Sequence, residues 1–432
     1  MKKLLMNGLI WQDTGFIKRD VLLKDGKIIA IDENLPESKA KIIDCSDALI
    51  LPGIVDMHVH VGEKTGGLAL ADDYVSLSIL GDLCGIAAIG AFITETSDTH
   101  QKQKTLCTQY MAANEKANLD FKQKIHWHLT PTVSEPQDII PLLREGCDLK
   151  FYTTYKNAGI YRSYKEIARW MQDLESYKPR MLVHCEDDEV VSVSSSYNPF
   201  HHPFDHTKRR PEKAEIVAVE KVLDLAVQHN YPVHIVHVST PEAALLVNQA
   251  RQSAPVTCET APHYLLLNEE YLKREDGHQW LCTPPLRSEA TRGKLVELLQ
   301  DGLFDAIATD HCPYITKDKD RSKDNPEQVP SGIAGLGATF PLLYENLVRN
   351  EKITLDELIT LISSNPAKLM NLYPEYGKIR IGSNASLIIL QNKTDRFTHH
   401  FVVSLSNTPN PWMDFSHNVN YRCSEVYNEN YE

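Results

Sequence analysis

Two histidines at an alternating spacing give the first chemical signal in the sequence. His58 and His60 close the apolar run LPGIVDMHVH. Side chains at i and i+2 of a β-strand point to the same side, so both imidazoles can reach one metal ion from one strand end. A pair with this spacing is often incidental. It indicates a metal site only if other strand ends also carry possible ligands.

Further strand-like runs carry a possible ligand at or near their ends: Lys150 in CDLKFYTTY, His184 in RMLVHCED, His237 in VHIVHVST and Asp310 in FDAIATDH. Any one of these histidines alone is more often a satisfied core residue. In a β/α barrel, however, the carboxyl ends of the strands meet at one mouth. The set together therefore favours a shared site, and imidazoles with a carboxylate suit Zn²⁺ or another borderline divalent ion.

The cysteines are the competing source of metal ligands. The chain has nine, an odd number, with no CxxC pair. Those nearest the candidate ligands share no ligand spacing, so we interpret them as reduced, small, buried hydrophobic residues: Cys185, Cys258, Cys282 and Cys312.

The elements that must position these ligands alternate between apolar strand-like runs and amphipathic helical stretches. The runs lie at 53–60, 91–98, 125–133, 147–155, 180–187, 233–240, 256–264 and 304–311, and the clearest helical patterns at 163–177 and 214–229. This alternation is typical of a parallel barrel or a doubly wound sheet. We favour an α/β fold built on a (β/α)8 TIM-like barrel.

Both ends of the chain have β character. In the first fifty residues Asp25-Gly26 separates two apolar runs, which is a strong hairpin signal. Near the other end, GKIRIGSNASLIILQ predicts two strands joined by a Gly-Ser-Asn turn. We therefore predict a small β-sandwich domain made of residues 1–51 and 376–432, the latter including a tail, with the barrel at 52–375 inserted between them.

Composition excludes several classes of protein. With 42% hydrophobic residues the chain is globular, and no window approaches the roughly 18 apolar residues of a spanning helix. The start MKKLLMNGLIWQD is too short for a secretory signal, so we expect a cytoplasmic protein without a membrane partner. A net charge of −13 disfavours nucleic acid, and the basic cluster KRRPEK at 208–213 is interpreted as a solvated helix start.

These motifs in this order resemble the cyclic amidohydrolases, the family of dihydropyrimidinase (hydantoinase), allantoinase and dihydroorotase. The resemblance covers nearly the whole chain through the strings PGIVDMHVH, DLKFYTTYK, VHCED, VHVST, APHYLLL, CTPPLR, ATDHCPY, SGIAGLGA, NPAKL and GKIRIGSNASLIIL. It implies two Zn²⁺ per subunit: one on His58, His60 and Asp310, the other on His184 and His237. Lys150, carboxylated by CO₂, would bridge them.

The resemblance also implies a mechanism. A hydroxide bridging the two metals attacks the ring amide, because coordination lowers the pKa of water toward ~7. Asp310 serves as general base and then acid. Tyr155, five residues after Lys150, is the candidate hydrogen-bond donor to the oxyanion, or simply a packed tyrosine. The expected substrate is a small cyclic amide or ureide, and the expected partner is another copy of the chain, in a dimer or tetramer.

Three positions bear on the substrate: Gly62, Thr283 and Tyr314. Dihydroorotases typically have Arg, Asn and His there, which serve a substrate carboxylate or ring. CTPPLR and DHCPY look more like hydantoinase strings, whereas SGIAGLGA resembles dihydroorotase and allantoinase. We therefore predict a hydantoinase or dihydropyrimidinase-like hydrolase, with dihydroorotase and allantoinase as alternatives. Arg162 or Arg287 reaching the pocket could restore the dihydroorotase interpretation, although Arg287 is expected to pair outside the site.

Two alternatives come from other classes. The family includes non-catalytic relatives that have lost their metal ligands. This chain retains every ligand type, which argues against its being such a relative. A mononuclear amidohydrolase such as a deaminase would not need Lys150.

Overall fold

The computed structural model describes residues 2–12, 15–36, 39–65, 68–96, 106–391, 402–415 and 419–424. Residues 425–432 of the predicted tail lie outside these ranges. Within them no helix is long and apolar enough to cross a membrane.

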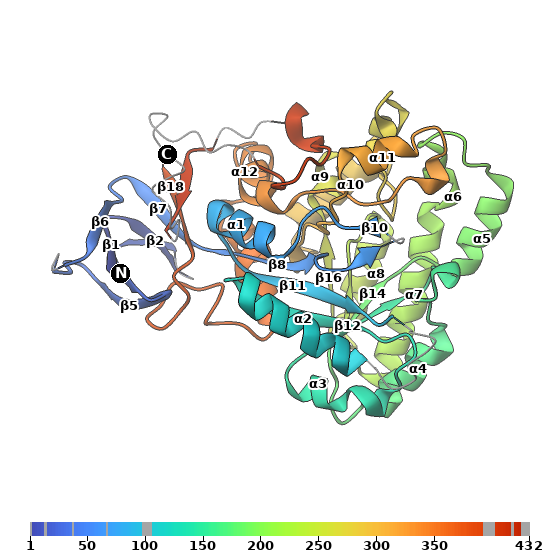
Figure 1. Ribbon diagram of the computed structural model, residues 1–432, viewed down its shortest axis with the longest axis horizontal. Helices are drawn as coiled ribbons and strands as arrows, with labels where there is room; N and C mark the ends of the chain where they lie inside the picture. The colour runs from blue at the N-terminus through green and yellow to red at the C-terminus, as the bar shows by residue number, and fades with distance from the viewer. Residues whose placement is uncertain are drawn as a thin grey trace.

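An eight-stranded parallel sheet forms the centre of the molecule (Figure 1). Its strands follow chain order, and each overlaps one of the eight predicted runs: β8 (Ile54–Val59), β11 (Ile86–Thr94), β12 (Lys124–Thr130), β13 (Asp148–Tyr152), β14 (Met181–His184), β15 (Val233–Ile235), β16 (Val256–Thr260) and β17 (Ala306–Ile307). The largest displacement is at β11, which starts five residues before its predicted run. A parallel bridge between Val59 and His311 links the first strand to the segment after the last. The sheet therefore closes nearly into a barrel, and the predicted fold class is confirmed.

Helices on the outside of the barrel cover the strands (Figure 1). The main ones are α1 (Tyr74–Cys84), α2 (Leu106–Asp120), α4 (Tyr164–Asp173), α7 (Glu212–His229), α8 (Pro241–Ala250) and α10 (Glu289–Gln300). The predicted helices at 163–177 and 214–229 correspond to α4 and α7. Ser163 begins α4 with a capping box, since its side chain accepts from the Glu166 N–H while Glu166 accepts from the Ser163 N–H.

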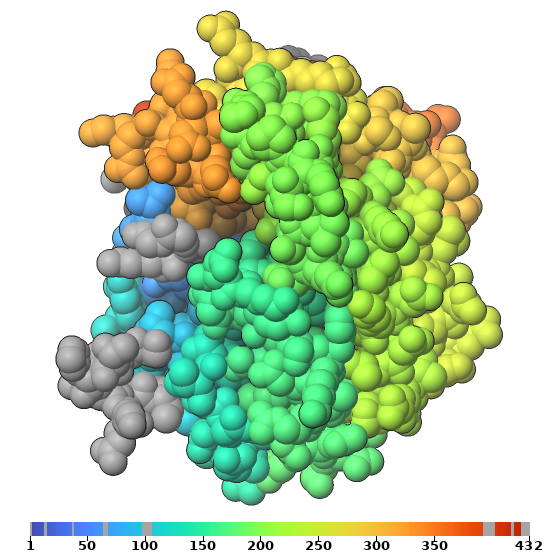
Figure 2. Space-filling view, turned by 90° about the vertical axis from the view of Figure 1, so that its right-hand side faces the viewer, coloured from blue at the N-terminus to red at the C-terminus, as the bar shows by residue number. Residues whose placement is uncertain are grey.

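Further helices are α5 (Asp188–Tyr197), α6 (Asp205–Arg209), α9 (Pro262–Leu266), α11 (Thr316–Arg321) and α12 (Thr339–Leu343). Of these, α5 and α6 supply residues to the barrel mouth. Figure 2 looks onto the side of the molecule away from the small sheets, where residues in green to orange, from the barrel part of the chain, form most of the surface.

Two smaller sheets pack at one end of the molecule. One has the order β5 (Lys27–Asp32), β4 (Asp20–Lys24), β1 (Lys2–Met6), β6 (Lys41–Asp44); the other has the order β19 (Tyr421–Cys423), β18 (Leu387–Gln391), β7 (Ala48–Pro52), β2 (Leu9–Gln12), β3 (Gly15–Lys18). Their facing side chains share one buried cluster that includes Leu5, Val21, Ile50 and Ile389. Because β18 pairs with β7, the two chain ends complete one sheet (Figure 1).

The hairpin predicted at Asp25-Gly26 is present: Lys24 pairs with Lys27, and the two turn residues have φ of 49° and 72°. The two strands predicted in GKIRIGSNASLIILQ are wrong in part, because only β18 forms there. The backbone before β18 bonds instead to the β4–β5 hairpin, through Ile28 N–H to Ser383 O and Ala385 N–H to Gly26 O. The boundaries at 51/52 and 375/376 stay a prediction.

Candidate metal centre

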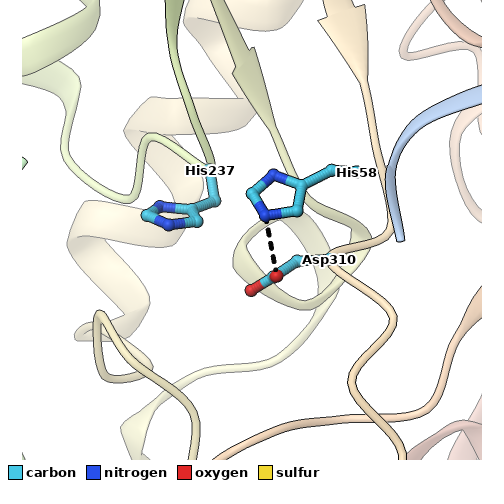
Figure 3. Close-up of side chains that lie close together, drawn as sticks. All are labelled: His58, His237 and Asp310. Atoms are coloured by element: carbon cyan, nitrogen blue, oxygen red, sulfur yellow. Dashed lines mark ion pairs between the residues drawn. The ribbon is translucent and has the colours of Figure 1, made fainter. Parts of the chain in front are cut away.

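The predicted ligands converge at the carboxyl ends of the barrel strands. His58 lies on β8, Lys150 on β13 and His184 at the end of β14, while His60, His237 and Asp310 lie just past β8, β15 and β17. Ligand atoms of His58, His237 and Asp310 all fall within 4.8 Å of one another (Figure 3). His184 Nδ1 is 2.9 Å from His237 Nε2, which joins a third imidazole to the group.

Asp310 is the anion at the centre of this cluster. Its Oδ1 is 3.1 Å from His58 Nε2 and 3.4 Å from His60 Nε2. Burial would raise the pKa of this carboxyl, but the imidazoles of His58 and His60 hold it well below its usual range. Asp310 and Glu63 in turn outweigh the effect of burial on His60 and raise its pKa to about 9. The cluster is therefore organised around an ionised carboxylate.

Carboxylates lie beside the outer ring nitrogens of three imidazoles and hydrogen-bond with two of them, those of His58 and His184. His58 Nδ1 is 2.5 Å from Glu259 Oε1, His184 Nε2 is 2.8 Å from Glu186 Oε2, and His60 Nδ1 is 3.5 Å from Glu63 Oε2. When the imidazole is neutral, an N–H donated to the carboxylate leaves the other nitrogen with a lone pair that can bind a metal ion. This is the arrangement by which proteins orient histidines that bind metals.

Sequence reasoning missed these three carboxylates. Glu63 and Glu186 follow a candidate ligand by three and two residues, in HVHVGE and HCE, so a search for acids close after each histidine finds both. Glu259 lies on β16, 201 residues after His58, and no local pattern links the two.

Lys150 is buried beside the cluster with 1% of its surface exposed. Its Nζ lies over the rings of Phe92 and Tyr152, 4.9 and 5.2 Å from their centroids, and among the described residues no carboxylate pairs with it. Burial lowers its pKa to about 8. With this lowered pKa, the amine reaches the neutral form that carboxylation by CO₂ requires more readily than an ordinary lysine does.

The backbone is strained at three site residues. Tyr155, His237 and Asp310 have φ of 71°, 39° and 50°, in the left-handed region that non-glycine residues seldom adopt. Each lies two or three residues past the end of a barrel strand. Strained backbone conformations persist only where the surrounding structure enforces them, and they are concentrated at functional sites.

A cavity of about 1140 Å³ opens above the cluster and is lined by all six predicted ligands together with Tyr155, Thr283 and Tyr314. Gly62 does not line it. A Cβ on Gly62 would lie 2.8 Å from Tyr74 Oη, so Tyr74 occupies the space that a larger side chain would need. Burial raises the pKa of Tyr155 above its usual range, which keeps its phenol a hydrogen-bond donor.

The arginines agree only in part with the sequence analysis. Arg162 donates to the carbonyls of Pro131 and Thr132, and Arg287 lies 3.6 Å from Glu215, outside the cavity lining as expected. The interpretation of KRRPEK as a solvated helix start is wrong for Arg209 and Arg210, which both line the cavity. Arg210 Nη1 is 2.5 Å from Glu186 Oε2, and this buried acid draws the arginine inward.

The cysteines behave as predicted: all nine are free and eight of them are buried. Burial raises the pKa of Cys185, Cys258, Cys282 and Cys312, which disfavours the thiolate form that binds metal.

A second His/Asp group lies at the opposite end of β12 and β13, where His126, His128 and Asp148 are all buried. Its members already have partners in the protein: His126 Nε2 is 2.8 Å from Asp148 Oδ2, and His128 Nε2 is 3.1 Å from the Met57 carbonyl. His128 Nδ1, 4.0 Å from Asp148 Oδ2, has no hydrogen-bond partner among the described residues. We interpret this group as a polar part of the core that is satisfied except at this nitrogen.

Comparison with known proteins identifies the family. The family model described as "Amidohydrolase family" matches residues 49–411. The chain belongs to the amidohydrolase family. The family prediction is thereby confirmed, as is the prediction of a hydrolase.

Individual relatives of this amidohydrolase cover almost its whole length. A dihydroorotase of Halalkalibacterium halodurans is 30% identical over 95% of this chain and 94% of its own. A D-hydantoinase of Geobacillus stearothermophilus is 28% identical over 93% of this chain and 88% of its own. The crystal structure of dihydropyrimidinase from Brevibacillus agri superposes with a TM-score of 0.84 at 25% identity, over 90% of this chain and 86% of that one.

Proposed function

We propose that this amidohydrolase opens the ring of a small cyclic amide at a binuclear zinc centre, in the manner of a hydantoinase or dihydropyrimidinase. The observation that carries the proposal is the inward-facing set of ring nitrogens around Asp310, with outer nitrogens held by carboxylates and a buried Lys150 alongside. Relatives named dihydroorotase, D-hydantoinase and dihydropyrimidinase support the substrate class.

The residues fit two ions. His58, His60 and Asp310 would hold one, His184 and His237 the other, and Lys150 as a carbamate would join them. A bare ammonium could only donate, so carboxylation is what converts Lys150 into a ligand. When bound, the two Zn²⁺ supply a nucleophile at neutral pH and polarise the substrate carbonyl.

The protein side chains then have separate tasks. Asp310, ionised and beside the cluster, takes up the proton of the attacking water and returns it to the departing ring nitrogen. Tyr155, held protonated by burial, donates to the oxygen on which negative charge develops.

The proposal is tested by metal analysis and ring opening together. We expect purified wild-type protein to hold two zinc ions per chain and Lys150→Ala to hold at most one, because the bridging ligand is gone. Hydantoin, dihydrouracil, allantoin and dihydroorotate are assayed side by side. Wild-type protein with neither bound zinc nor lysine carbamate would support a non-catalytic relative, and full metal retention in Lys150→Ala would support a mononuclear enzyme.

Dihydroorotase is the second candidate, favoured by the relative at 30% identity. The close approach of Tyr74 to Gly62 counts against it, since an arginine at position 62 has no room without displacing that ring. Allantoinase is a further alternative, and the substrate panel decides among the three.

A further inference from the structure

Two of the carboxylates behind the cluster have different surroundings. Glu186, fully buried, accepts from His184 and also from the guanidinium of Arg210 at 2.5 Å. Glu259, 1% exposed, meets His58 and lies 3.3 Å from His234 Nε2, and among the described residues no Lys or Arg pairs with it. One acid is neutralised by an arginine, whereas the other is not.

This difference affects how strongly each histidine binds a cation. A carboxylate on the outer N–H of an imidazole makes the inner nitrogen more basic, and losing it typically weakens metal binding ~10–100-fold. A guanidinium on the same carboxylate withdraws part of that charge and adds repulsion toward the ion. His58 therefore has the stronger support and His184 the weaker.

Arg210 is fixed in this role by its own contacts. Its guanidinium lies over the Tyr155 ring at 4.9 Å, and its Nη1 reaches Glu186 from the residue just past α6. The Tyr155 ring in turn lies 5.2 Å from the His184 ring. The arginine is thus a built part of the His184 side of the cluster.

We infer that Glu259 and the Glu186–Arg210 pair are positioning residues that give the two ions unequal affinities, the ion on the His58 side being held more tightly. This inference rests on the proposed binuclear centre. It extends that function by assigning the order in which the centre fills and empties, and by giving a role to Arg210, an arginine in the cavity wall that the ring-opening steps do not use.

The inference is tested by competition for Zn²⁺ with a chromogenic chelator, which needs no substrate. Wild-type protein is expected to release zinc in two phases. Glu259→Gln should weaken the tighter phase ~10–100-fold and leave the weaker phase in place. Arg210→Gln should strengthen the weaker phase, because Glu186 then serves His184 alone. Arg210→Lys, which keeps the charge, should resemble wild type.

A matched control is Glu215→Gln. Glu215 is also a buried acid beside an arginine, Arg287, but it accepts hydrogen bonds from Ser239 and, within the described part of the chain, from no histidine of the cluster. Thermal unfolding of each variant verifies that it is folded. A purely structural role for Arg210 predicts weaker metal binding in Arg210→Gln, and that result would overturn the inference.

The failure of this inference and that of the proposed function give different results. Two equal zinc affinities, unchanged in Glu259→Gln, would refute the inference and leave the binuclear centre standing. Binding of one zinc or none by the wild-type protein would refute the proposed function itself.

Discussion

Asp310 is the residue on which the proposed chemistry depends most directly. Its carboxylate faces His58 and His60 and is ionised, because both imidazoles hold its pKa far below the usual range. An amide in its place keeps the shape but can neither take up nor return a proton. Replacing Asp310 by asparagine therefore tests proton transfer separately from metal binding.

We predict that Asp310→Asn lowers kcat by ~10²–10⁴-fold, the usual contribution of a general acid and base. Metal content, measured by inductively coupled plasma mass spectrometry on the same sample, should stay substantial because the other ligands remain. Unchanged turnover would remove Asp310 from the role of base.

Lys150 gives a prediction for pH. Burial lowers its pKa from 10.5 to about 8, so between these values the unfolded chain holds a proton that the folded, metal-free chain does not. Unfolding then takes up a proton, and the free energy of unfolding rises with pH across that window.

Urea denaturation of the metal-free proteins measures this effect. From pH 8 to 10.5, the free energy of unfolding of the wild type should rise by about 3 kcal/mol relative to that of Lys150→Met. Lys319, whose pKa burial also lowers to about 8, is present in both proteins and cancels. A difference that does not change with pH would show that the Lys150 amine is not desolvated in this way.

At the scale of elements, the close contact of β11 with its neighbours positions the histidine strand. Gly90 lies on β11 where a Cβ would overlap the Met57 carbonyl and approach His128 Nε2 to 2.5 Å. Met57 directly precedes His58 on β8. A side chain at position 90 therefore has to push apart the strand that carries the first ligand.

We expect Gly90→Ala to cost ~1–3 kcal/mol, as overpacking usually does, and to weaken zinc binding because β8 shifts. Gly293→Ala is the matched control, since it lies within α10 with open space around its Cα. There alanine should stabilise the fold by ~0.5–1 kcal/mol. Chemical denaturation measures both, and equal effects would contradict the contact argument.

At the scale of the whole molecule, the last described strands complete a sheet that begins near the first residue. β18 pairs with β7 in antiparallel register, with Ile389 opposite Ile50, and both side chains enter the core between the two small sheets. The two ends of the chain thus stabilise each other across more than three hundred intervening residues.

We predict that Ile389→Ala lowers the free energy of unfolding by ~2–5 kcal/mol, because it leaves a cavity in that core. Ile381→Ala, in the same segment but 59% exposed, should change it little. Denaturation monitored by tryptophan fluorescence compares the two. A similar cost for both variants would mean that the shared core does not carry the stabilisation.

The sequence by itself determined the barrel and the candidate ligands. Alternation of strand and helix is a local property, since each run buries its own face. Parallel strands in a barrel end at one mouth. The strand-end positions alone therefore predicted that five ligands lie close together: His58, Lys150, His184, His237 and Asp310. The hairpin at Asp25-Gly26 was predictable for the same reason, because two turn residues decide it.

Only the tertiary structure decided which groups support those ligands. Glu259 reaches His58 from 201 residues away, Arg210 turns inward toward buried Glu186, and Tyr74 occupies the space beside Gly62. Each depends on a contact between segments whose separation in sequence carries no periodic signal. Hydrogen bonding to the β4–β5 hairpin likewise replaced the predicted strand before β18, because backbone partners are chosen in space and not along the chain.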